Sequence, residues 1–315
     1  MTPERRATLA ALTATLGELS IPYAENDPLS RRTSFRIGGP AALTVTPRNR
    51  AELIALLDLC REQAGGCPVL LLGRGSNVLF SDEGYAGVVI RTTEVRRVVF
   101  DTACDACEPS GLIYADCGAS LSALAAACVT EGRSLAGLAF VHGIPGSVGG
   151  AVVMNAGAYG GEMAQVVTEV TCLTADGEIE TVTDFDFGYR TSVFKDGSRM
   201  ILSAAFKLEQ GDREAIKARM DELSAQRQAK QPLEYPSAGS MFKRPVGYFA
   251  GALIEQAGLK GFTVGGAQVS EKHAGFVINR GGATCSDVLE LVRRVQEKIR
   301  ADVGVDLEME VKILR

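Results

Sequence analysis

The sequence reads Gly143-Ile-Pro-Gly146-Ser-Val-Gly149-Gly150-Ala-Val-Val-Met-Asn155-Ala-Gly-Ala-Tyr159-Gly160 in a glycine-dense stretch near its middle. The repeated glycines leave one side of the loop without side chains, so its backbone can approach a pyrophosphate closely. A crowded packing turn would also need glycines, but it gives no reason for Asn155 and Tyr159 among the small residues. The stretch therefore favours a phosphate-binding loop, with a packing turn as the alternative.

A second glycine loop, Gly73-Arg-Gly75-Ser76-Asn77, follows an apolar run that reads as a buried strand. It is not a Rossmann fingerprint, because Val78 stands where the third glycine is needed, and it lacks the Gly-Lys-Ser/Thr of a P-loop. Successive amides after a strand still form a concave site for anions, with a plain turn as the alternative. Two such loops in successive α/β blocks suit a long dinucleotide such as FAD.

The chain divides into three predicted blocks, at residues 1–93, 94–210 and 211–315. The first block is predicted to hold a helix capped by Asn49 and two buried strands, at 69–72 and 88–90. In the second block a helix follows Ser120, and two β-rich runs flank Asp176-Gly177, which is a typical hairpin turn.

The third block begins with a charged helix near Asp212. Thr284 and Asp287 then form a predicted capping box, and apolar residues recur behind it at helical spacing. These apolar residues are Val288, Leu291, Val292, Val295 and Ile299. The run from Leu307 to Ile313 alternates strictly between apolar and polar residues, which predicts a strand with Glu308, Glu310 and Lys312 on its polar face.

The composition is that of a globular protein, with 315 residues, 46% of them hydrophobic and 23% charged. A net charge of −5 argues against a general nucleic-acid binder, which normally has a basic face. No apolar run reaches the length of about 18 residues that a membrane-spanning helix needs. The N-terminus predicts an amphipathic helix with Leu9, Leu12 and Leu16, rather than a signal peptide, so we expect a cytoplasmic protein.

The sequence contains eight cysteines, which we expect to be reduced thiols in a chain of this length without an export signal. Cys104-Asp-Ala-Cys107 has the spacing of half a zinc knuckle. A structural zinc site needs a second close pair, and none follows, because Cys117 is alone and His142 is distant. A polar surface turn is therefore the preferred interpretation of this motif, and no metal is expected.

Six motifs together resemble one family, the UDP-N-acetylenolpyruvoylglucosamine reductases. They occur in family order from about residue 30 to the C-terminus, and they are the Gly73 and Gly143 loops, Thr33-Ser-Phe-Arg-Ile-Gly-Gly-Pro40, Tyr189-Arg-Thr-Ser192, Pro236-Ser-Ala-Gly-Ser-Met-Phe-Lys243 and Gly265-Gly-Ala-Gln-Val-Ser270. The short interval between Gly239-Ser240 and Gly265-Gly266 resembles the compact subtype, which lacks an extra substrate loop.

The resemblance implies an α+β protein with an FAD-binding fold of the vanillyl-alcohol-oxidase/PCMH type. Two α/β lobes, predicted at 1–93 and 94–210, would bind FAD, and an α/β substrate domain would occupy 211–315. The implied reaction has two halves: NADPH reduces the non-covalently bound flavin, and the flavin then passes hydride to UDP-N-acetylglucosamine enolpyruvate. The product is UDP-N-acetylmuramate, a peptidoglycan precursor, and a monomer is expected.

Three residues match the family's catalytic positions. Hydride addition beside a carboxylate builds up enolate-like charge, for which a fixed cation and a proton donor are needed. Arg190 matches the catalytic arginine, with a surface arginine after a turn as the alternative. Ser240 matches the proton donor, with Lys243 close in sequence to stabilise its alkoxide and a turn serine as the alternative. Glu310 matches the catalytic glutamate, although Glu308 shares its predicted strand face.

The remaining assignments also follow from the resemblance. The expected FAD contacts are Arg36, Gly73, Gly75, Ser76, Asn77, Gly143, Ile144, Gly146, Ser147, Gly149, Gly150 and Ala151. The expected contacts to the UDP-sugar or to NADPH are Tyr189, Arg227, Lys243, Gln268 and His273. Arg244 departs from the family, in which many members have asparagine after the lysine. His142 invites comparison with flavin-linking histidines, but the family holds FAD non-covalently.

Two other functions fit parts of the sequence. Another flavoenzyme of the same superfamily, which oxidises an alcohol or lactone with oxygen, would keep both glycine loops. It gives no reason for Arg190, Ser240 and Glu310 together. A non-catalytic nucleotide-binding or sensor protein would also keep the loops, and it predicts that replacing Ser240 has no effect.

Overall fold

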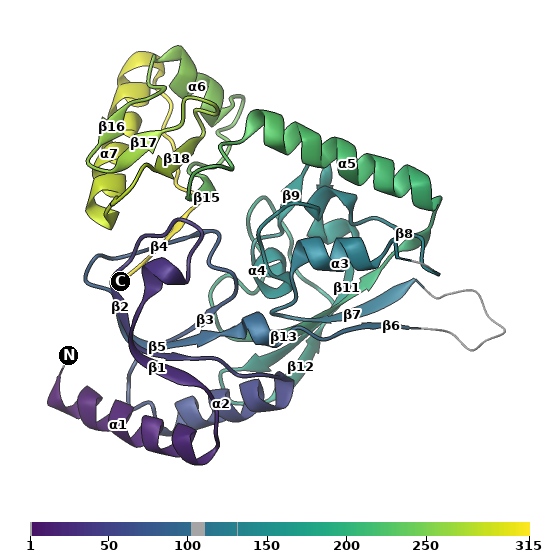
Figure 1. The fold of residues 1–315 in the computed structure, drawn as a ribbon, viewed down its shortest axis with the longest axis vertical. Helices are drawn as coiled ribbons and strands as arrows, with labels where there is room; N and C mark the ends of the chain where they lie inside the picture. Colours follow the sequence, from purple (N-terminus) through teal and green to yellow (C-terminus); the bar gives the residue numbers. More distant parts are fainter. Residues whose placement is uncertain (1, 102–110, 131) are drawn as a thin grey trace. The chain divides into compact units, whose positions relative to one another are not determined.

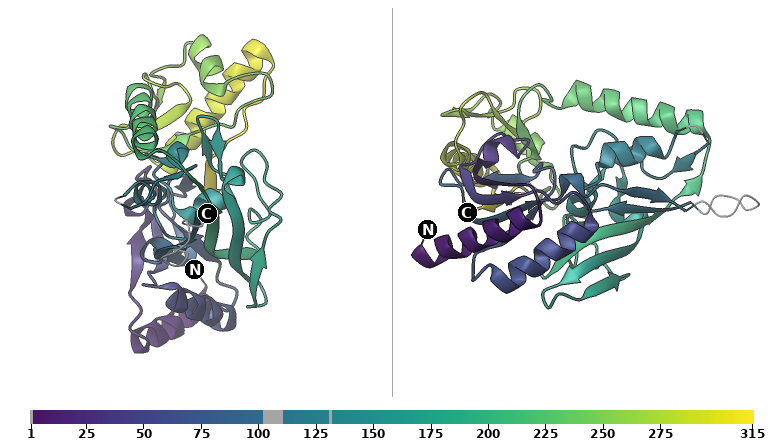
Figure 2. Two further views of the ribbon diagram at one scale, coloured as in Figure 1. Left: turned by 90° about the vertical axis from the view of Figure 1, so that its right-hand side faces the viewer. Right: turned by 60° about the horizontal axis from the view of Figure 1, so that its bottom comes forward.

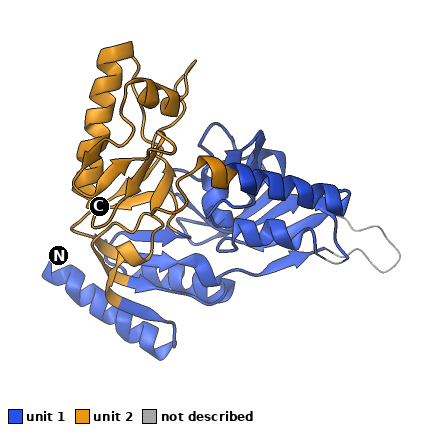
Figure 3. Cartoon of the chain, turned by 45° about the horizontal axis from the view of Figure 1, so that its top comes forward, with its two compact units in different colours: residues 1–24, 44–74, 88–226 blue, residues 25–43, 75–87, 227–315 orange. Residues whose placement is uncertain are grey.

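The computed structural model describes residues 2–101, 111–130 and 132–315. Contacts between residues divide the chain into two compact units, which Figure 3 colours separately. Unit 1 consists of residues 1–24, 44–74 and 88–226, and unit 2 of residues 25–43, 75–87 and 227–315. The predicted domains are continuous blocks divided at 93/94 and 210/211, whereas each compact unit combines separate segments of the chain. The domain division stays a prediction.

Unit 1 begins with two helices, α1 (Pro3–Glu18) and α2 (Arg50–Gln63), which lie side by side in Figures 1 and 2. The apolar faces of both helices are buried, including Leu12 of α1 and Leu53 of α2. Asn49 caps α2 as predicted, because its side-chain oxygen accepts a hydrogen bond from the amide of Glu52 at 2.9 Å.

A four-stranded sheet has the order β1-β2-β5-β3. Its strands are β1 (Tyr23–Pro28), β2 (Pro40–Val45), β3 (Val69–Leu72) and β5 (Tyr85–Arg91). The predicted strands at 69–72 and 88–90 are confirmed, and they pair in parallel, Val69 opposite Val88. β3 ends at Leu72, so the glycine loop starts directly at the end of a strand.

A five-stranded sheet in unit 1 is antiparallel, with the order β12-β11-β13-β7-β6. Its strands are β6 (Val98–Phe100), β7 (Leu112–Asp116), β11 (Val167–Thr174), β12 (Ile179–Val182) and β13 (Arg199–Lys207). The predicted hairpin is confirmed, because β11 and β12 pair around a turn in which Gly177 has φ 87°.

Three helices of this part of the chain are α3 (Leu121–Ala127), α4 (Val148–Val153) and the long α5 (Arg213–Lys230). α4 packs on β13 and β7. The short elements are β8 (Leu135–Ala136), β9 (Gly157–Ala158), β10 (Gly161–Glu162), β14 (Glu209–Gln210) and the 3-10 turns η1 (Leu29–Arg31), η2 (Thr92–Glu94), η3 (Ala139–Val141) and η4 (Met163–Gln165). β8 pairs with β14, and β9 pairs with β10.

Unit 2 contains an antiparallel sheet with the order β15-β18-β17-β16, covered by helices α6 (Ala250–Gln256) and α7 (Cys285–Val303). The strands are β15 (Ser237–Ser240), β16 (Thr263–Val264), β17 (Ala267–Val269) and β18 (Phe276–Asn279). The predicted capping box of Thr284 and Asp287 begins α7, and the apolar face predicted behind it is buried in the core of this unit.

The C-terminal strand is shorter than predicted, which corrects the expectation of a strand from Leu307 to Ile313. Only β19 (Lys312–Leu314) is a strand, and it pairs in parallel with β4 (Val78–Phe80). Before it, Met309 forms an isolated bridge with Phe242, and Val311 lies in a bend. The segment changes its hydrogen-bonding partner at this bend, so one continuous strand cannot form.

None of the helices in the described ranges is long and apolar enough to cross a lipid bilayer.

Candidate active site

The two glycine loops meet within unit 1 at Gly73 and Ser147. A Cβ added to Gly73 would overlap the hydroxyl of Ser147, and it would lie 3.1 Å from the Ser147 Cβ. Ser147 is buried at the start of α4. The contact explains why residue 73 has no side chain, and it brings the first glycine of one loop against the second loop.

The first loop passes from unit 1 into unit 2 after Arg74, and it contains backbone amides that are not used as donors among the described residues. The amides of Arg74, Gly75 and Ser76 have no hydrogen-bond acceptor within the described part of the chain. Gly75 has φ 62°, and the amide of Ser34 donates to its carbonyl at 3.1 Å. A Cβ at Gly75 would lie 3.0 Å from the Cα of Thr33. Successive free amides in a loop that follows a strand fit the diphosphate of a dinucleotide.

The second loop uses its glycines in two ways. A Cβ at Gly146 would lie 2.9 Å from the Cδ1 of Leu121, and one at Gly149 would lie 3.0 Å from the Cβ of Cys117. These two glycines are therefore required by packing, as the packing-turn alternative held. Gly143 and Gly150 are exposed, and Gly143 has φ 81°. These two glycines leave bare backbone on the surface at the start of the loop and in α4, and Gly160 does so at the end of the stretch.

The first amides of α4 are already bonded within the protein. The amide of Val148 donates to the Ala119 carbonyl at 2.9 Å, and the amide of Gly149 donates to the Cys117 carbonyl at 2.8 Å. These amides are not available to an anion, so Gly149 supports the loop rather than binding phosphate through its N–H. Burial raises the pKa of the Cys117 thiol to about 12, so the thiol stays protonated beneath this loop.

The Ser122 side chain forms hydrogen bonds to the backbone of the second loop, a role that was not predicted from the sequence. Its hydroxyl accepts a hydrogen bond from the Gly143 amide at 3.1 Å and donates to the Ile144 carbonyl at 3.3 Å. Ile144 is half-buried and Ala151 is buried. A serine in the first turn of a helix reads as a local capping residue, so the long-range contact could be found only in the folded chain.

Arg190 stands on a tight turn in unit 1. The turn runs from Gly188 to Thr191, which exchange two backbone hydrogen bonds of 3.2 and 3.3 Å. Arg190 has φ 57°, a left-handed conformation that costs a residue with a side chain about 1–2 kcal/mol. Its guanidinium donates to the Gly157 carbonyl at 3.3 Å and lies 5.2 Å from the ring centre of Tyr189, which is 54% exposed.

Ser240 lies at the end of β15 in unit 2 and is exposed. Its strand has a bulge between Ser237 and Ser240, where Gly239 has φ 79°. The next amide, that of Met241, donates to the Gly275 carbonyl at 2.9 Å. The bulge bends the strand just before its last residue, Ser240, and such bulges are common next to active sites.

Glu310 is tied by its main chain to both Met241 and Asn77. Its amide donates to the Met241 carbonyl at 2.9 Å, and its own carbonyl accepts a hydrogen bond from the Asn77 side chain at 3.3 Å. The Asn77 carbonyl in turn accepts the Lys312 amide at 3.1 Å. Unit 2 therefore brings Glu310 next to the residue that follows Ser240, and next to the first glycine loop.

Lys243 and Glu308 form an ion pair, with side chains 20% and 71% exposed. The backbone joins the same residues, because the Lys243 amide donates to the Glu308 carbonyl at 2.8 Å. Lys243 was expected to stabilise a Ser240 alkoxide, whereas its ammonium lies on the Glu308 carboxylate. The two glutamates therefore differ in their surroundings. Glu308 is exposed and paired with a lysine, whereas Glu310 is half-buried.

The other expected substrate contacts are spread over unit 2. Arg227, in α5, is 7% exposed. The amide nitrogen of Gln268 donates to the Gly261 carbonyl at 3.3 Å and to the Thr263 hydroxyl at 3.1 Å. In His273, Nδ1 accepts the Gly275 amide at 3.1 Å, and burial lowers the pKa of the ring, so the neutral form is favoured.

Arg36 and the motif around it are held by unit 2. Arg36 is exposed with φ 56°, and the side chain of Asn279 donates to its carbonyl at 3.4 Å. A left-handed arginine in an exposed loop is uncommon, and such strain clusters at functional sites.

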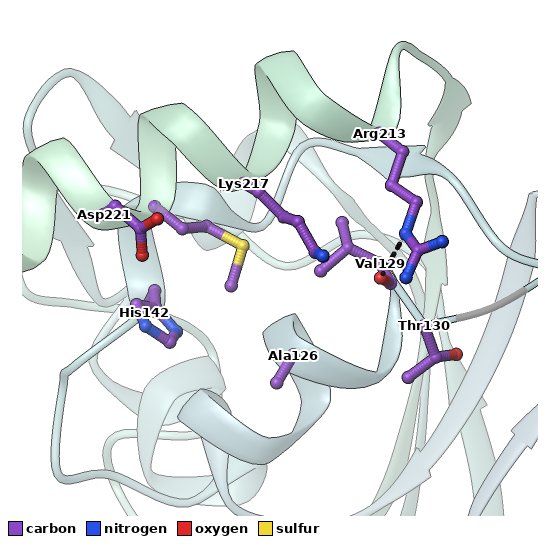
Figure 4. A pocket seen from close by; sticks show the side chains of 8 residues that line it. Ala126, Val129, Thr130, His142, Arg213, Lys217 and Asp221 are labelled. Atoms are coloured by element: carbon purple, nitrogen blue, oxygen red, sulfur yellow. Dashed lines mark hydrogen bonds between the residues drawn. The ribbon is translucent and has the colours of Figure 1, made fainter.

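His142 lies in unit 1, in a cavity of about 460 Å³ beside α5 and α3. Figure 4 shows its ring below Asp221, with Lys217 and Arg213 farther along the same helix. Its Nδ1 is buried and has no hydrogen-bond partner among the described residues. Cys104 and Cys107, the possible half of a zinc knuckle, lie outside the described residues.

Comparisons with known proteins name one activity along most of the chain. Residues 231–314 match the family model described as UDP-N-acetylenolpyruvoylglucosamine reductase, C-terminal domain, and residues 41–183 match the model of an FAD binding domain. The UDP-N-acetylenolpyruvoylglucosamine reductase of Agathobacter rectalis is 49% identical over 300 residues, which cover 92% of this chain and 93% of the relative. The enzyme of Caldanaerobacter subterraneus is 45% identical over 291 residues, which cover 92% of each chain.

A solved structure with the same fold is that of the UDP-N-acetylenolpyruvylglucosamine reductase from Thermus caldophilus. It is 36% identical, covers 94% of this chain and 99% of its own, and superimposes with a TM-score of 0.75. The predicted fold class is confirmed: the chain is an α+β protein with an FAD-binding fold of the vanillyl-alcohol-oxidase type and a separate C-terminal domain.

Proposed function

Because the chain belongs to the family of UDP-N-acetylenolpyruvoylglucosamine reductases, we propose that it reduces UDP-N-acetylglucosamine enolpyruvate to UDP-N-acetylmuramate. FAD is its cofactor, NADPH supplies the electrons, and the product feeds peptidoglycan synthesis. The observation that carries the proposal is the match to this family, with 49% identity to one member over more than nine-tenths of both sequences.

The glycine loops would hold FAD. The free amides of Arg74 to Ser76 would bind its diphosphate, and the exposed backbone at Gly143 and Gly150 would lie against the cofactor. Ser147, Ile144 and Ala151 would line the same part of the loop, and Asn77 and Arg36 would add polar contacts. When bound, FAD takes up two electrons from NADPH and delivers them to the vinyl group of the substrate.

Arg190 would stabilise the charge that develops on the substrate carboxylate during the second half-reaction. Its guanidinium is permanently ionised and planar, so it can give two hydrogen bonds to one carboxylate. The left-handed turn supports this assignment, because a glycine or asparagine would fill the same position at a lower cost in conformational energy. An arginine at this strained position therefore indicates that its guanidinium has a function.

Ser240 would donate the proton that completes the reduction, and Glu310 would hold a second proton beside it. The exposed hydroxyl at the end of β15 supports the first role. A protonated Glu310 could donate a hydrogen bond to the substrate carboxylate, whereas its ionised form would repel it. The main-chain bond from Glu310 to Met241 supports a shared task for the two side chains.

Tyr189, Arg227, Lys243, Gln268 and His273 remain our candidates for binding the UDP-sugar or NADPH. A monomeric, cytoplasmic enzyme that binds neither nucleic acid nor membranes completes the proposal. The buried free thiols of the described cysteines support a reducing compartment. Sedimentation of the FAD-loaded protein tests the oligomeric state, and a dimer would contradict a monomer.

The experiment that tests the function is an anaerobic titration of the purified protein. NADPH should bleach the visible absorbance of the bound flavin, and UDP-N-acetylglucosamine enolpyruvate should restore it with formation of UDP-N-acetylmuramate. An oxidase of the same superfamily would instead be reduced by an alcohol or lactone and reoxidised rapidly by oxygen. A protein that binds no flavin would contradict both activities.

A further inference from the structure

The turn that carries Arg190 is attached to the second glycine loop by side chains. Hydrogen bonds with a side chain at one end join residues 153–157 to residues 188–192. Asn155 donates to the Gly188 carbonyl at 3.1 Å, Ser192 donates to the Val153 carbonyl at 2.9 Å, and Arg190 donates to the Gly157 carbonyl at 3.3 Å. No backbone–backbone hydrogen bond joins the two segments in the part of the chain that is described.

Asn155 is the most deeply placed of these side chains. It is 2% exposed and has φ 41°, a left-handed conformation that asparagine tolerates better than most residues. Its amide nitrogen donates to the Gly188 carbonyl, and its oxygen accepts the Ala164 amide at 3.0 Å. Both polar groups of the side chain therefore have a hydrogen-bond partner. The oxygen binds Ala164, which follows the glycine loop, and the nitrogen binds Gly188 of the Arg190 turn.

The carbonyl that Asn155 holds is the one that closes the turn. The Gly188 carbonyl also accepts the Thr191 amide, so the bond from Asn155 fixes the first residue of the turn while the turn itself fixes Arg190. Arg190 is strained and half-buried, and it lies in the turn itself rather than in a strand or helix. The turn that carries its guanidinium is thus bonded to a side chain that is distant in sequence.

We propose that Asn155 is the positioning residue for Arg190, and that it sets the orientation of the guanidinium through the Gly188 carbonyl. The inference rests on the catalytic role proposed above for Arg190. Asparagine is required because one side chain must donate to one carbonyl and accept from one amide. Aspartate keeps the shape and the acceptor but loses the donor, and its charge faces a carbonyl oxygen.

A double-mutant cycle on the FAD-loaded protein tests the proposal. The variants are Asn155→Asp, Arg190→Ala and the two together, and the two half-reactions are followed separately by the flavin absorbance. Misplacing a catalytic group by about 1 Å costs up to about 10²-fold, so we expect Asn155→Asp to slow reoxidation by the enolpyruvyl substrate about 10- to 100-fold. Reduction by NADPH should stay within about three-fold of the wild-type rate, because Arg190 has no role in it.

The cycle separates a positioning role from a structural one. If Asn155 acts through Arg190, then adding Asn155→Asp to Arg190→Ala should change reoxidation by no more than about two-fold. If the double variant instead loses the product of the two single-variant losses in reoxidation rate, the inference about Asn155 is overturned. The role of Arg190 would then remain intact. Wild-type reoxidation by Arg190→Ala would overturn both the inference and the role of Arg190.

Gln165→Glu is the matched control. The Gln165 amide nitrogen donates to the Gly160 carbonyl at 3.3 Å, on the same glycine-rich stretch, and within the described residues Gln165 has no hydrogen bond to residues 188–192. The change from amide to carboxylate is the same as in Asn155→Asp. We expect wild-type rates in both half-reactions, and an equal loss of reoxidation would show that loosening of the stretch, not the Asn155 bond, explains the effect.

Asn155→Gly keeps the test decisive if the aspartate variant fails to take up FAD. Glycine accepts φ 41° without strain and removes the bond to Gly188 without adding charge. It should lose reoxidation in the same cycle with Arg190→Ala and keep reduction by NADPH. Full reoxidation by the FAD-loaded glycine variant would overturn the proposal.

Discussion

In unit 2, Ser240 and Glu310 are positioned by main-chain hydrogen bonds, whereas in unit 1 Arg190 stands on a turn that side chains hold in place. The Glu310 amide donates to the Met241 carbonyl, and the Asn77 carbonyl accepts the Lys312 amide. By contrast, the Asn155 side chain donates to the Gly188 carbonyl of the Arg190 turn, and the Arg190 side chain donates to the Gly157 carbonyl. Main-chain bonds are available whatever the side chain is, so the two arrangements should respond differently to substitution.

The largest effect is expected from the side chains that do the chemistry. Ser240→Ala removes the proposed proton donor, and general acid catalysis typically contributes about 10²–10⁴-fold, so turnover should fall by that factor. Ser237→Ala, on the same strand, is the matched control and should leave turnover unchanged. Steady-state NADPH consumption measures both variants, and normal turnover by Ser240→Ala would remove the residue from the acid role.

Arg190→Ala should come next, because it removes preorganised charge stabilisation that is worth about 10²–10³-fold. Arg190→Lys keeps the charge but loses the planar fork, so it should recover only part of the rate. The measurement is the rate of flavin reoxidation by the enolpyruvyl substrate. Equal rates for the lysine and alanine variants would mean that the charge at this position is not what matters.

Gly73→Ala should weaken FAD binding in unit 1, since the added Cβ would overlap the Ser147 hydroxyl. We expect a loss of roughly ten-fold in affinity, which corresponds to about 1.4 kcal/mol. Gly17→Ala, where nothing lies within 4 Å of an added Cβ, is the control. Quenching of flavin fluorescence on binding measures both, and unchanged affinity in Gly73→Ala would contradict close approach of the two loops.

A smaller effect is expected where unit 2 relies on its main chain. Glu308→Gln removes the exposed ion pair with Lys243, and such pairs are worth about 0–1 kcal/mol. The backbone bond between the same two residues remains, so kcat should fall by less than about five-fold, the factor that about 1 kcal/mol corresponds to. A loss in kcat as large as that of Asn155→Asp would contradict the claim that unit 2 tolerates loss of a side-chain contact better than unit 1.

The smallest effect concerns the start of α7. Backbone hydrogen bonds, first from Thr284, hold the pKa of Asp287 below its usual 3.8. The stability that this carboxylate contributes is therefore present above its unfolded pKa and is lost as the pH falls through the lower folded value. Asp287→Asn should lower stability at pH 7 by about 0.5–1 kcal/mol, as other capping changes do. Urea unfolding at decreasing pH should show the difference shrinking below the ordinary aspartate pKa, and a constant difference would contradict the assignment.

Sequence periodicity predicted the elements whose partners lie nearby. The capping box of α7 and its buried face, the cap of α2 and the hairpin at Gly177 all follow from local residue types. The glycine loops were also found, although only the structure separates Gly146 and Gly149, which packing requires, from Gly143 and Gly150, which are exposed.

Partners that are distant in sequence could not be predicted. The alternation before the C-terminus indicates burial but does not say that the segment leaves Phe242 and joins β4 at the bend of Val311. Similarly, nothing near Lys243 marks Glu308 as its partner, and nothing near Asn155 marks the Gly188 carbonyl as its acceptor. These are pairings of single polar groups, for which a sequence carries no periodic signal.

The most direct measurement is a single-turnover comparison of wild type, Ser240→Ala and Arg190→Ala, each loaded with FAD and studied without oxygen. Both variants should bleach with NADPH at nearly the wild-type rate and then regain the flavin absorbance slowly, if at all, when the enolpyruvyl substrate is added. Loss of bleaching in either variant, or recovery of absorbance at the wild-type rate, would contradict the assignment of these side chains to the second half-reaction.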